Sequence, residues 1–441
     1  MKAGLGGENC QLALLALFIF VLPIPETIAL RYALFAALVL ASAFAARVGG
    51  AKAAFVPEIR WPVVLLLALT GWLLLQALTI SGYQTLALRE IKSQWLPSLV
   101  AFGLGLFIAR PSEAGPRIVS VAMLTMLAQS LFSLLFGIFV WLEEGAFPVG
   151  ATDWTAGKLE ISYLNNLLLA FLAVDLAFRL FCRRTASDLP SWLLYVGIVL
   201  VLVSNLAFGA RNGIIGSVLL VVSLCLVVVL REARRFGRRR VLAGLGLCVT
   251  LAIVLGWSNF QLDVRWQKFS ETARLAWDID TYHAWLDETR FSLPLLADGE
   301  EVDASAYLRL AWMRVGTRLV AEYPLGVGYS RNAFGHALRR TEASSVGHSH
   351  SGIVDLAVGA GIPGLLLWLG WSFALMGIGL RRYVRQGEAR GLILFFIVAG
   401  FLGRMLLDSI NRDHMLLLFF LLVGLLLPRA ATAPDKDARH V

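Results

Sequence analysis

"SGIVDLAVGAGIPGLLLWLGWSFALMGIGL" (351–380) is a long apolar run in which Asp355 is the single charged residue. A helix of roughly 20 such residues crosses the hydrocarbon core of a bilayer. Similar runs recur along the chain, which has 441 residues, of which 58% are hydrophobic and 16% charged. Soluble domains are closer to half apolar and a quarter charged. The sequence therefore predicts an all-α polytopic membrane protein.

Breaks rich in arginine, glycine or proline divide the apolar sequence into twelve predicted membrane-spanning helices. These cover residues 11–30, 31–48, 61–82, 95–110, 117–142, 163–181, 189–208, 212–230, 241–260, 351–380, 390–409 and 414–430. We therefore expect nine such helices within 1–260, one large loop at 261–349, three more helices within 350–430 and a polar tail at 431–441. Lys2 precedes the first run without a convincing small-residue cleavage site, so we expect that helix to be uncleaved.

The formal net charge of +9 is concentrated in alternate short loops. "RLFCRR" (179–184), "REARRFGRRR" (231–240) and "RRYVRQGEAR" (381–390) fall on one predicted face, which the positive-inside rule assigns to the cytoplasm. The charge then needs no nucleic-acid partner to explain it. Residues 261–349 lie on the opposite, outer face, and a loop of this size is usually functional.

A predicted amphipathic helix lies within this loop. "SAYLRLAWMRVGTRLVAEYP" (305–324) places four apolar residues at helical spacing: Leu308, Trp312, Val315 and Leu319. Pro324 ends the pattern. We expect this helix to lie on the membrane surface or to cap the bundle. The glycine-rich turn "PLGVGYS" (324–330) that follows offers backbone N–H groups that could bind an anion.

Two histidines lie directly before the apolar run, and His350 is the nearer one. Ser349 or Ser351 can cap the helix that follows. The positive end of the helix dipole would keep His350 neutral near pH 7, which suits a general base. A histidine bonded to backbone or lipid headgroups is the alternative. His348 either shares the role or positions the loop.

Arginines on the outer face run against the positive-inside trend. Arg211, in "AFGARNGIIG" (207–216), either grips a phosphate with its guanidinium or extends to lipid headgroups. Arg265, after the ninth predicted helix, can converge with Arg211, and two fixed cations suit a diphosphate. Arg309 is a third candidate, although a solvated helix face explains it more simply. No CxxC motif or His/Cys cluster at metal-ligand spacing occurs, so we expect no metal site.

Three stretches together resemble the O-antigen ligase family of bacterial inner-membrane glycosyltransferases. They are "ARNGIIG" (210–216), "SAYLRLAWMRVGTRLVAEYPLGVG" (305–328) and "HSGIVDLAVGAGIPGLLLWL" (350–369). The resemblance runs from about the seventh to the eleventh predicted helix, and the twelve-span plan with one large late outer loop agrees with it.

Some positions match the family's motifs more closely than others. Counting back from Gly361 and Gly364 matches the family's histidine to His350. The following position, where the family usually has Asn, is Ser351, and Gly359 stands where Glu is frequent. The family's Ser-Arg-Gly break matches this chain only at Arg211, and Arg265 matches by position more than by motif.

The resemblance implies a fold similar to GT-C-type glycosyltransferases and an activity on the periplasmic side of the inner membrane. The implied reaction transfers O-antigen glycan from undecaprenyl diphosphate to lipid A-core oligosaccharide, with inversion and without a metal or other cofactor. It also implies that His350 is the catalytic base, that Arg211 and Arg265 bind the diphosphate, and that His348 and Arg309 are possible auxiliaries.

Three alternatives remain open at the level of sequence. A related polymerase would extend the glycan on its lipid carrier, but such enzymes more often have two sizeable outer loops. A protein-glycosylating relative would carry a longer soluble C-terminal part than 431–441. A transporter or flippase would need a polar pathway at mid-membrane, broken helices or internal repeats, which the sequence does not indicate.

Overall fold

The computed structural model describes residues 2–48, 57–109, 115–236, 268–287 and 289–428, with a few single residues and short pieces between 239 and 253. In these residues, β-structure is limited to one isolated antiparallel bridge between Leu295 and Glu301. The all-α class is therefore confirmed for the part of the chain that is described.

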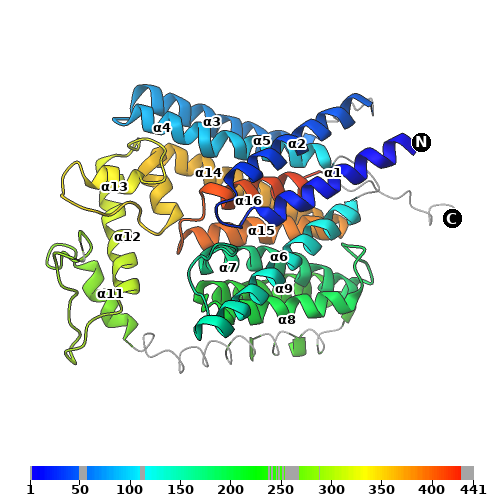
Figure 1. Ribbon diagram of the computed structural model, residues 1–441. Helices are drawn as coiled ribbons and strands as arrows, with labels where there is room; N and C mark the ends of the chain where they lie inside the picture. Colours follow the sequence, from blue (N-terminus) through cyan, green and yellow to red (C-terminus); the bar gives the residue numbers. More distant parts are fainter. Residues whose placement is uncertain are drawn as a thin grey trace.

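Long helices lie side by side and form the body of the molecule (Figure 1). The N-terminal part comprises α1 (Lys2–Val21), α2 (Ile28–Val48), η1 (Pro57–Ile59), α3 (Arg60–Thr79), α4 (Gln84–Glu90), the π-helix η2 (Ile91–Trp95), α5 (Leu96–Ile108), α6 (Gly115–Glu144), α7 (Lys158–Ala177), the π-helix η3 (Phe178–Cys182), α8 (Ser191–Ala207) and α9 (Arg211–Phe236). The C-terminal part comprises α14 (Gly352–Gln386), α15 (Ala389–Met405) and α16 (Asp413–Leu426).

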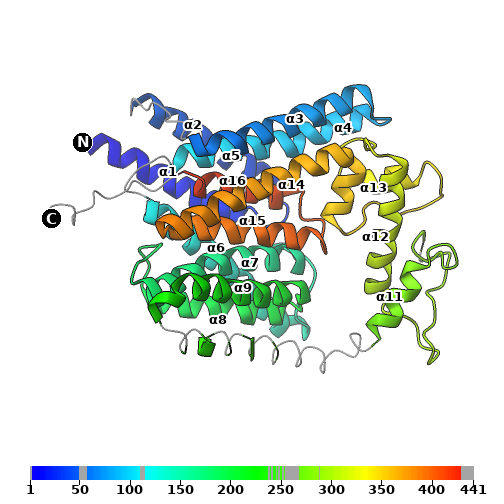
Figure 2. The ribbon, with the colours of Figure 1, turned by 180° about the vertical axis from the view of Figure 1, so that it is seen from behind.

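Three further helices gather at one end of this body, opposite the start of α1 (Figures 1 and 2). They are α11 (Phe269–Trp277), α12 (Ala304–Glu322) and α13 (Ala333–Leu338). We call this the loop end. The predicted large loop thus forms a compact structure that packs on the bundle, with its own apolar core that also takes in Val358 of α14.

Seven helices among the described residues are long and apolar enough to cross a membrane, and three more are shorter but apolar. The chain therefore has the composition of a multi-pass membrane protein. The ninth predicted span, 241–260, falls mostly outside the described residues, so the count of twelve stays a prediction. Each other predicted span overlaps a helix.

The first predicted boundary was wrong. The apolar pattern predicted a boundary between the first two helices after residue 30, but α1 ends at Val21 and α2 begins at Ile28. Pro23 and Pro25 lie in the turn between them, and proline lacks the N–H that a continuing helix needs.

Helix α12 confirms the predicted amphipathic helix. The Asp303 side chain caps its start by accepting a hydrogen bond from the Ala306 N–H, and the helix ends just before Pro324. All four residues of the predicted apolar stripe are buried: Leu308, Trp312, Val315 and Leu319. Gly316 makes close packing on α14 possible, because a Cβ there would lie 2.2 Å from a methyl carbon of Val354. The helix caps the bundle.

Helix α14 is broken at Gly361, which has φ 72° and ψ 178°, and Pro363 follows the break. The loop 324–328 supplies replacement hydrogen bonds: the N–H groups of Val327 and Gly328 donate to the carbonyls of Val358 and Gly359, and Ile362 donates to Pro324. Trp72 and Gln76 of α3 also donate to carbonyls here, at 2.7 Å to Ala360 and 2.8 Å to Gly359. The N–H groups of Val327 and Gly328 are thus already used, which argues against the anion-binding role that the turn "PLGVGYS" suggested.

The break in α14 gives a first prediction. Gly361→Ala should lower the free energy of unfolding, since a side chain in left-handed backbone costs about 1–3 kcal/mol. The new Cβ would also lie 2.3 Å from the Leu325 carbonyl carbon. Gly370→Ala on the same helix is the control, because nothing lies within 4 Å of a Cβ there. Thermal unfolding of both variants in detergent, compared with the wild type, measures the difference, and equal Tm values would contradict it.

Candidate active site

His350 lies at the loop end, two residues before α14 begins. Its backbone has φ 57°, in the left-handed region that residues other than glycine rarely adopt. Both neighbours are fixed: Ser351 caps α14 by accepting from the Val354 N–H, and the N–H and hydroxyl of Ser349 both donate to Asp355 at 2.8 Å. Strained backbone held in this way is typical of functional sites.

The His350 imidazole contacts two other rings. It stacks on Trp312 of α12, with ring centroids 5.3 Å apart and planes 14° apart. The His348 ring centroid is 4.2 Å away. The indole N–H of Trp312 donates to the Trp285 carbonyl at 2.8 Å, which fixes the stacking surface. The structure at the loop end therefore positions the His350 ring.

Both histidines are held in the neutral form. Burial lowers the pKa of His350 to about 4, with help from the charges of Arg309 and Arg412, while Asp408 opposes the shift. Burial also lowers the pKa of His348 to about 3, again assisted by Arg412. The neutral state expected from the sequence is therefore found, but its main cause is burial and not the helix dipole.

Asp408, just after α15, joins four parts of the site. Its carboxylate accepts from Arg404 Nε at 2.6 Å and from Asn212 Nδ2 at 3.1 and 3.2 Å, and Arg309 Nη2 lies 3.8 Å from Oδ1. Its main-chain carbonyl accepts from the N–H of Gly352, the first residue of α14. The start of α9, the loop helix α12 and the start of α14 are thereby linked.

The three predicted arginines have different outcomes. Arg309 lies beside the site, as its contact with Asp408 shows, and its side chain is 35% exposed and so not fully solvated. Arg211 is the first residue of α9, next to Asn212, but its side chain is outside what the structure describes. Arg265 also falls outside the described residues. The convergence of Arg211 and Arg265 on a diphosphate remains a prediction.

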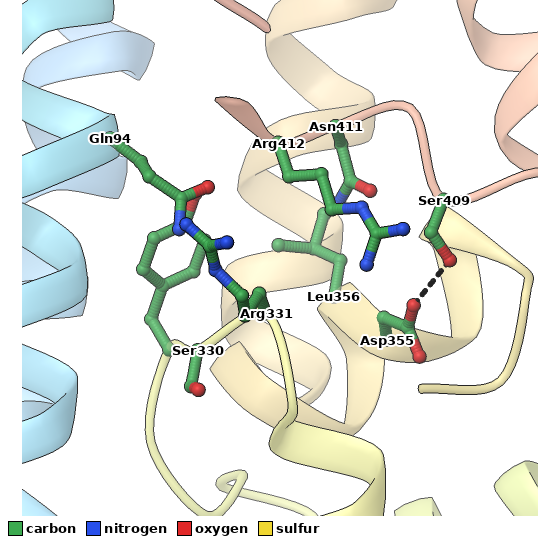
Figure 3. Close-up of a pocket in the computed structure, with 9 residues that line it drawn as sticks. Gln94, Ser330, Arg331, Asp355, Leu356, Ser409, Asn411 and Arg412 are labelled. Atoms are coloured by element: carbon green, nitrogen blue, oxygen red, sulfur yellow. Dashed lines mark hydrogen bonds between the residues drawn. The ribbon is translucent and has the colours of Figure 1, made fainter. Parts of the chain in front are cut away.

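Sequence reasoning missed Arg412, which lies directly before α16. Its Nη2 is 3.4 Å from Nε2 of His348. It lines a narrow pocket together with Arg331, Asp355 and Ser409, and Figure 3 shows the guanidinium of Arg412 on the Ser409 side of that pocket. The signal was present in the sequence: "NRD" (411–413) puts an arginine on the predicted outer face, the argument applied to Arg211.

Gly359, where the resembled family often has Glu, has no room for a larger side chain. A Cβ there would lie 3.0 Å from the Ala333 Cβ. The carbonyl of Gly359 instead accepts from Gln76 and Gly328. A side chain of α3 therefore reaches this part of α14.

The fold and the site together define a class: a multi-pass membrane protein with a neutral imidazole among fixed cations at one end of its helices. Residues 196–369 match the family model described as O-Antigen ligase, so this stretch of the chain is similar to that family. The matched stretch contains His350, Arg211, Arg265 and Arg309. No curated protein matches the chain.

No metal site is evident near His350 in the described part of the chain. Throughout the part of the chain that is described, no group of three or more His, Cys, Asp or Glu side chains is arranged to hold a metal ion. Whether the reaction is independent of metal is a separate matter, which stays a prediction.

The charge beside His350 gives a second prediction. Arg309→Gln removes a cation that lowers the pKa of His350, so that pKa should rise, by a few tenths to about one unit. Because the protonated imidazole cannot act as a base, activity should then be lost at a higher pH than in the wild type. The acid limb of kcat/KM against pH, which reports the free enzyme, measures this.

Arg314→Gln is the matched control for this experiment. Arg314 lies on the same helix, but its guanidinium is over the Trp277 ring, 5.8 Å from the centroid. Its removal should leave the acid limb in place. Identical profiles for Arg309→Gln and the wild type would show that the charge of Arg309 does not act on His350.

Proposed function

We propose that this protein is an O-antigen ligase of the bacterial inner membrane. In this proposal it transfers O-antigen glycan from undecaprenyl diphosphate to lipid A-core oligosaccharide on the periplasmic face. The observation that carries the proposal is the position of His350, within the segment that matches the family: a neutral imidazole in strained backbone, beside fixed cations, at the end of a membrane-spanning helix.

The proposed reaction is a single displacement. A hydroxyl of the lipid A-core sugar attacks the anomeric carbon of the donor and loses its proton to a nitrogen of His350. The bond from that carbon to the diphosphate oxygen breaks, and undecaprenyl diphosphate leaves with the electron pair. The anomeric configuration inverts. A positioned base of this kind contributes about 10²–10⁴-fold to the rate.

Charge near the leaving group is the second requirement. Arg211 and Arg265 are the proposed diphosphate ligands, because guanidinium groups bind phosphate oxygens bidentately and stabilise charge that develops on them. A bound diphosphate also acts on the base. Its negative charge offsets the cations that lower the pKa of His350, so the imidazole becomes a stronger base when the donor is present.

His350→Ala tests the proposal directly. The assay contains purified protein in detergent, lipid A-core, undecaprenyl-diphosphate glycan and excess chelator. We expect the wild type to form ligated lipid A-core and His350→Ala to lose about 10²-fold or more of that rate. His283→Ala is the control, since His283 is an exposed histidine of the loop domain. Both variants should keep the wild-type Tm.

Each other result has a defined meaning. A longer glycan that stays on the carrier, without ligated lipid A-core, would identify a polymerase. Ligation by the wild type that chelator abolishes would exclude the metal-independent mechanism. A normal rate for His350→Ala would remove His350 from the chemistry.

A further inference from the structure

The role of the second histidine can be argued from its contact with Arg412. We propose that His348 and Arg412 form an anion subsite that binds a phosphate group of one of the two lipid-linked substrates, while His350 alone is the base. This inference rests on the proposed function for the identity of its ligand. The geometry of the subsite stands independently of it.

Arg412 is a half-buried cation with unused donors. Among the described residues, the one hydrogen bond of its side chain goes to His348, at 3.4 Å. No carboxylate of the described residues lies within ion-pair distance of it, although Glu160 and Asp355 are near enough to feel its charge. A guanidinium has five N–H donors. Most of them therefore remain available to a ligand.

Arg331, in the same pocket, shows the contrast. Its guanidinium lies 2.8 Å from the Asp413 carboxylate and 3.3 Å from that of Glu90. Figure 3 shows it on the Gln94 side, across the pocket from Arg412. Two carboxylates compensate the charge of Arg331. Of these two arginines, Arg412 is the one whose charge a substrate would compensate.

The contact between Arg412 and His348 is itself a reason to expect an anion. Arginine is a donor only, so Nε2 of His348 must accept from it, and the proton of the ring lies on Nδ1. Protonation of that ring next to a cation is unfavourable, which agrees with its low pKa. A phosphate placed between the two groups would accept from the guanidinium, and it would accept from the imidazole once the ring proton moves from Nδ1 to Nε2. It would replace a weak contact with two charge-assisted hydrogen bonds.

The position of the pair suits a substrate of the neighbouring base. The rings of His348 and His350 are in contact, with centroids 4.2 Å apart, and the charge of Arg412 acts on both. A phosphate bound by His348 and Arg412 would thus lie next to His350, the proposed base. It would hold a substrate without occupying the His350 ring.

Binding of inorganic diphosphate to the full chain in detergent tests the subsite without turnover. We expect Arg412→Gln to weaken the affinity about tenfold, the size of one lost charge-assisted hydrogen bond. His348→Phe should weaken it too, whereas His348→Gln, which keeps an N–H donor, should retain most of it. Arg331→Gln is the matched control and should stay within about twofold of the wild type, because its charge is already paired.

Steady-state transfer kinetics then identify the source of the phosphate. Arg412→Gln should raise the KM of one substrate while leaving kcat within about threefold. A raised donor KM assigns the carrier diphosphate, and a raised acceptor KM assigns a phosphate of lipid A-core. Unchanged diphosphate affinity and unchanged KM values in Arg412→Gln would overturn the subsite.

Two features keep this test distinct from that of the proposed function. If the protein binds diphosphate through Arg412 but transfers no glycan, the subsite is supported and the proposed function is not. If Arg412→Gln transfers glycan with unchanged KM values and diphosphate affinity, the proposed function is supported and the subsite is not. If Arg412→Gln does not fold, Arg412→Lys, which keeps the charge but not the planar fork, and His348→Phe carry the same comparison.

Discussion

A helix broken inside an apolar bundle must have its free backbone groups bonded by other parts of the chain, and this requirement organises the loop end of the molecule. At the break at Gly361, the carbonyls of Val358 and Gly359 accept from the loop 324–328, and Gln76 of α3 adds a further donor. The same hydrogen bonds hold the loop end against the helix bundle. The start of α14, and His350 with it, is therefore fixed by contacts made more than a turn away.

Two buried acids, Asp408 and Asp355, accept hydrogen bonds around the start of α14. The Asp408 carboxylate accepts hydrogen bonds from Arg404 and Asn212, and its main-chain carbonyl accepts from the Gly352 N–H. Asp355 accepts from Ser349 and from the hydroxyl of Ser409 and so holds the turn that carries His350. Buried acids whose oxygens are bonded in this way act as structural anchors.

The two histidines of one short motif have different neighbours. His350 stacks on Trp312, whereas His348 contacts Arg412. Both rings are neutral because they are buried among positive charges. An anion bound beside these rings would raise the pKa of both imidazoles, because it would offset the positive charges that lower it.

The sequence by itself determined the features that depend on neighbouring residues along the chain. Apolar runs predicted the helices, the spacing of Leu308 to Leu319 predicted α12, and the "HSH" stretch placed a histidine at a helix start. Even the family match could be anticipated from local motifs. The first helix boundary was predicted wrongly, since the chain turns at Pro23 and Pro25 and not after residue 30.

Only the tertiary structure decided which distant residues meet. Asn212 bonds Asp408 across 196 positions of sequence, and Arg412 reaches His348 across 64. No local pattern encodes such pairs, because they form when segments that are distant in the sequence pack together. Burial, the main cause of the low pKa of His350, is likewise a property of the packed molecule. The sequence alone thus predicted the histidine at the start of a helix, whereas its buried environment results from the packing of the loop end on α14.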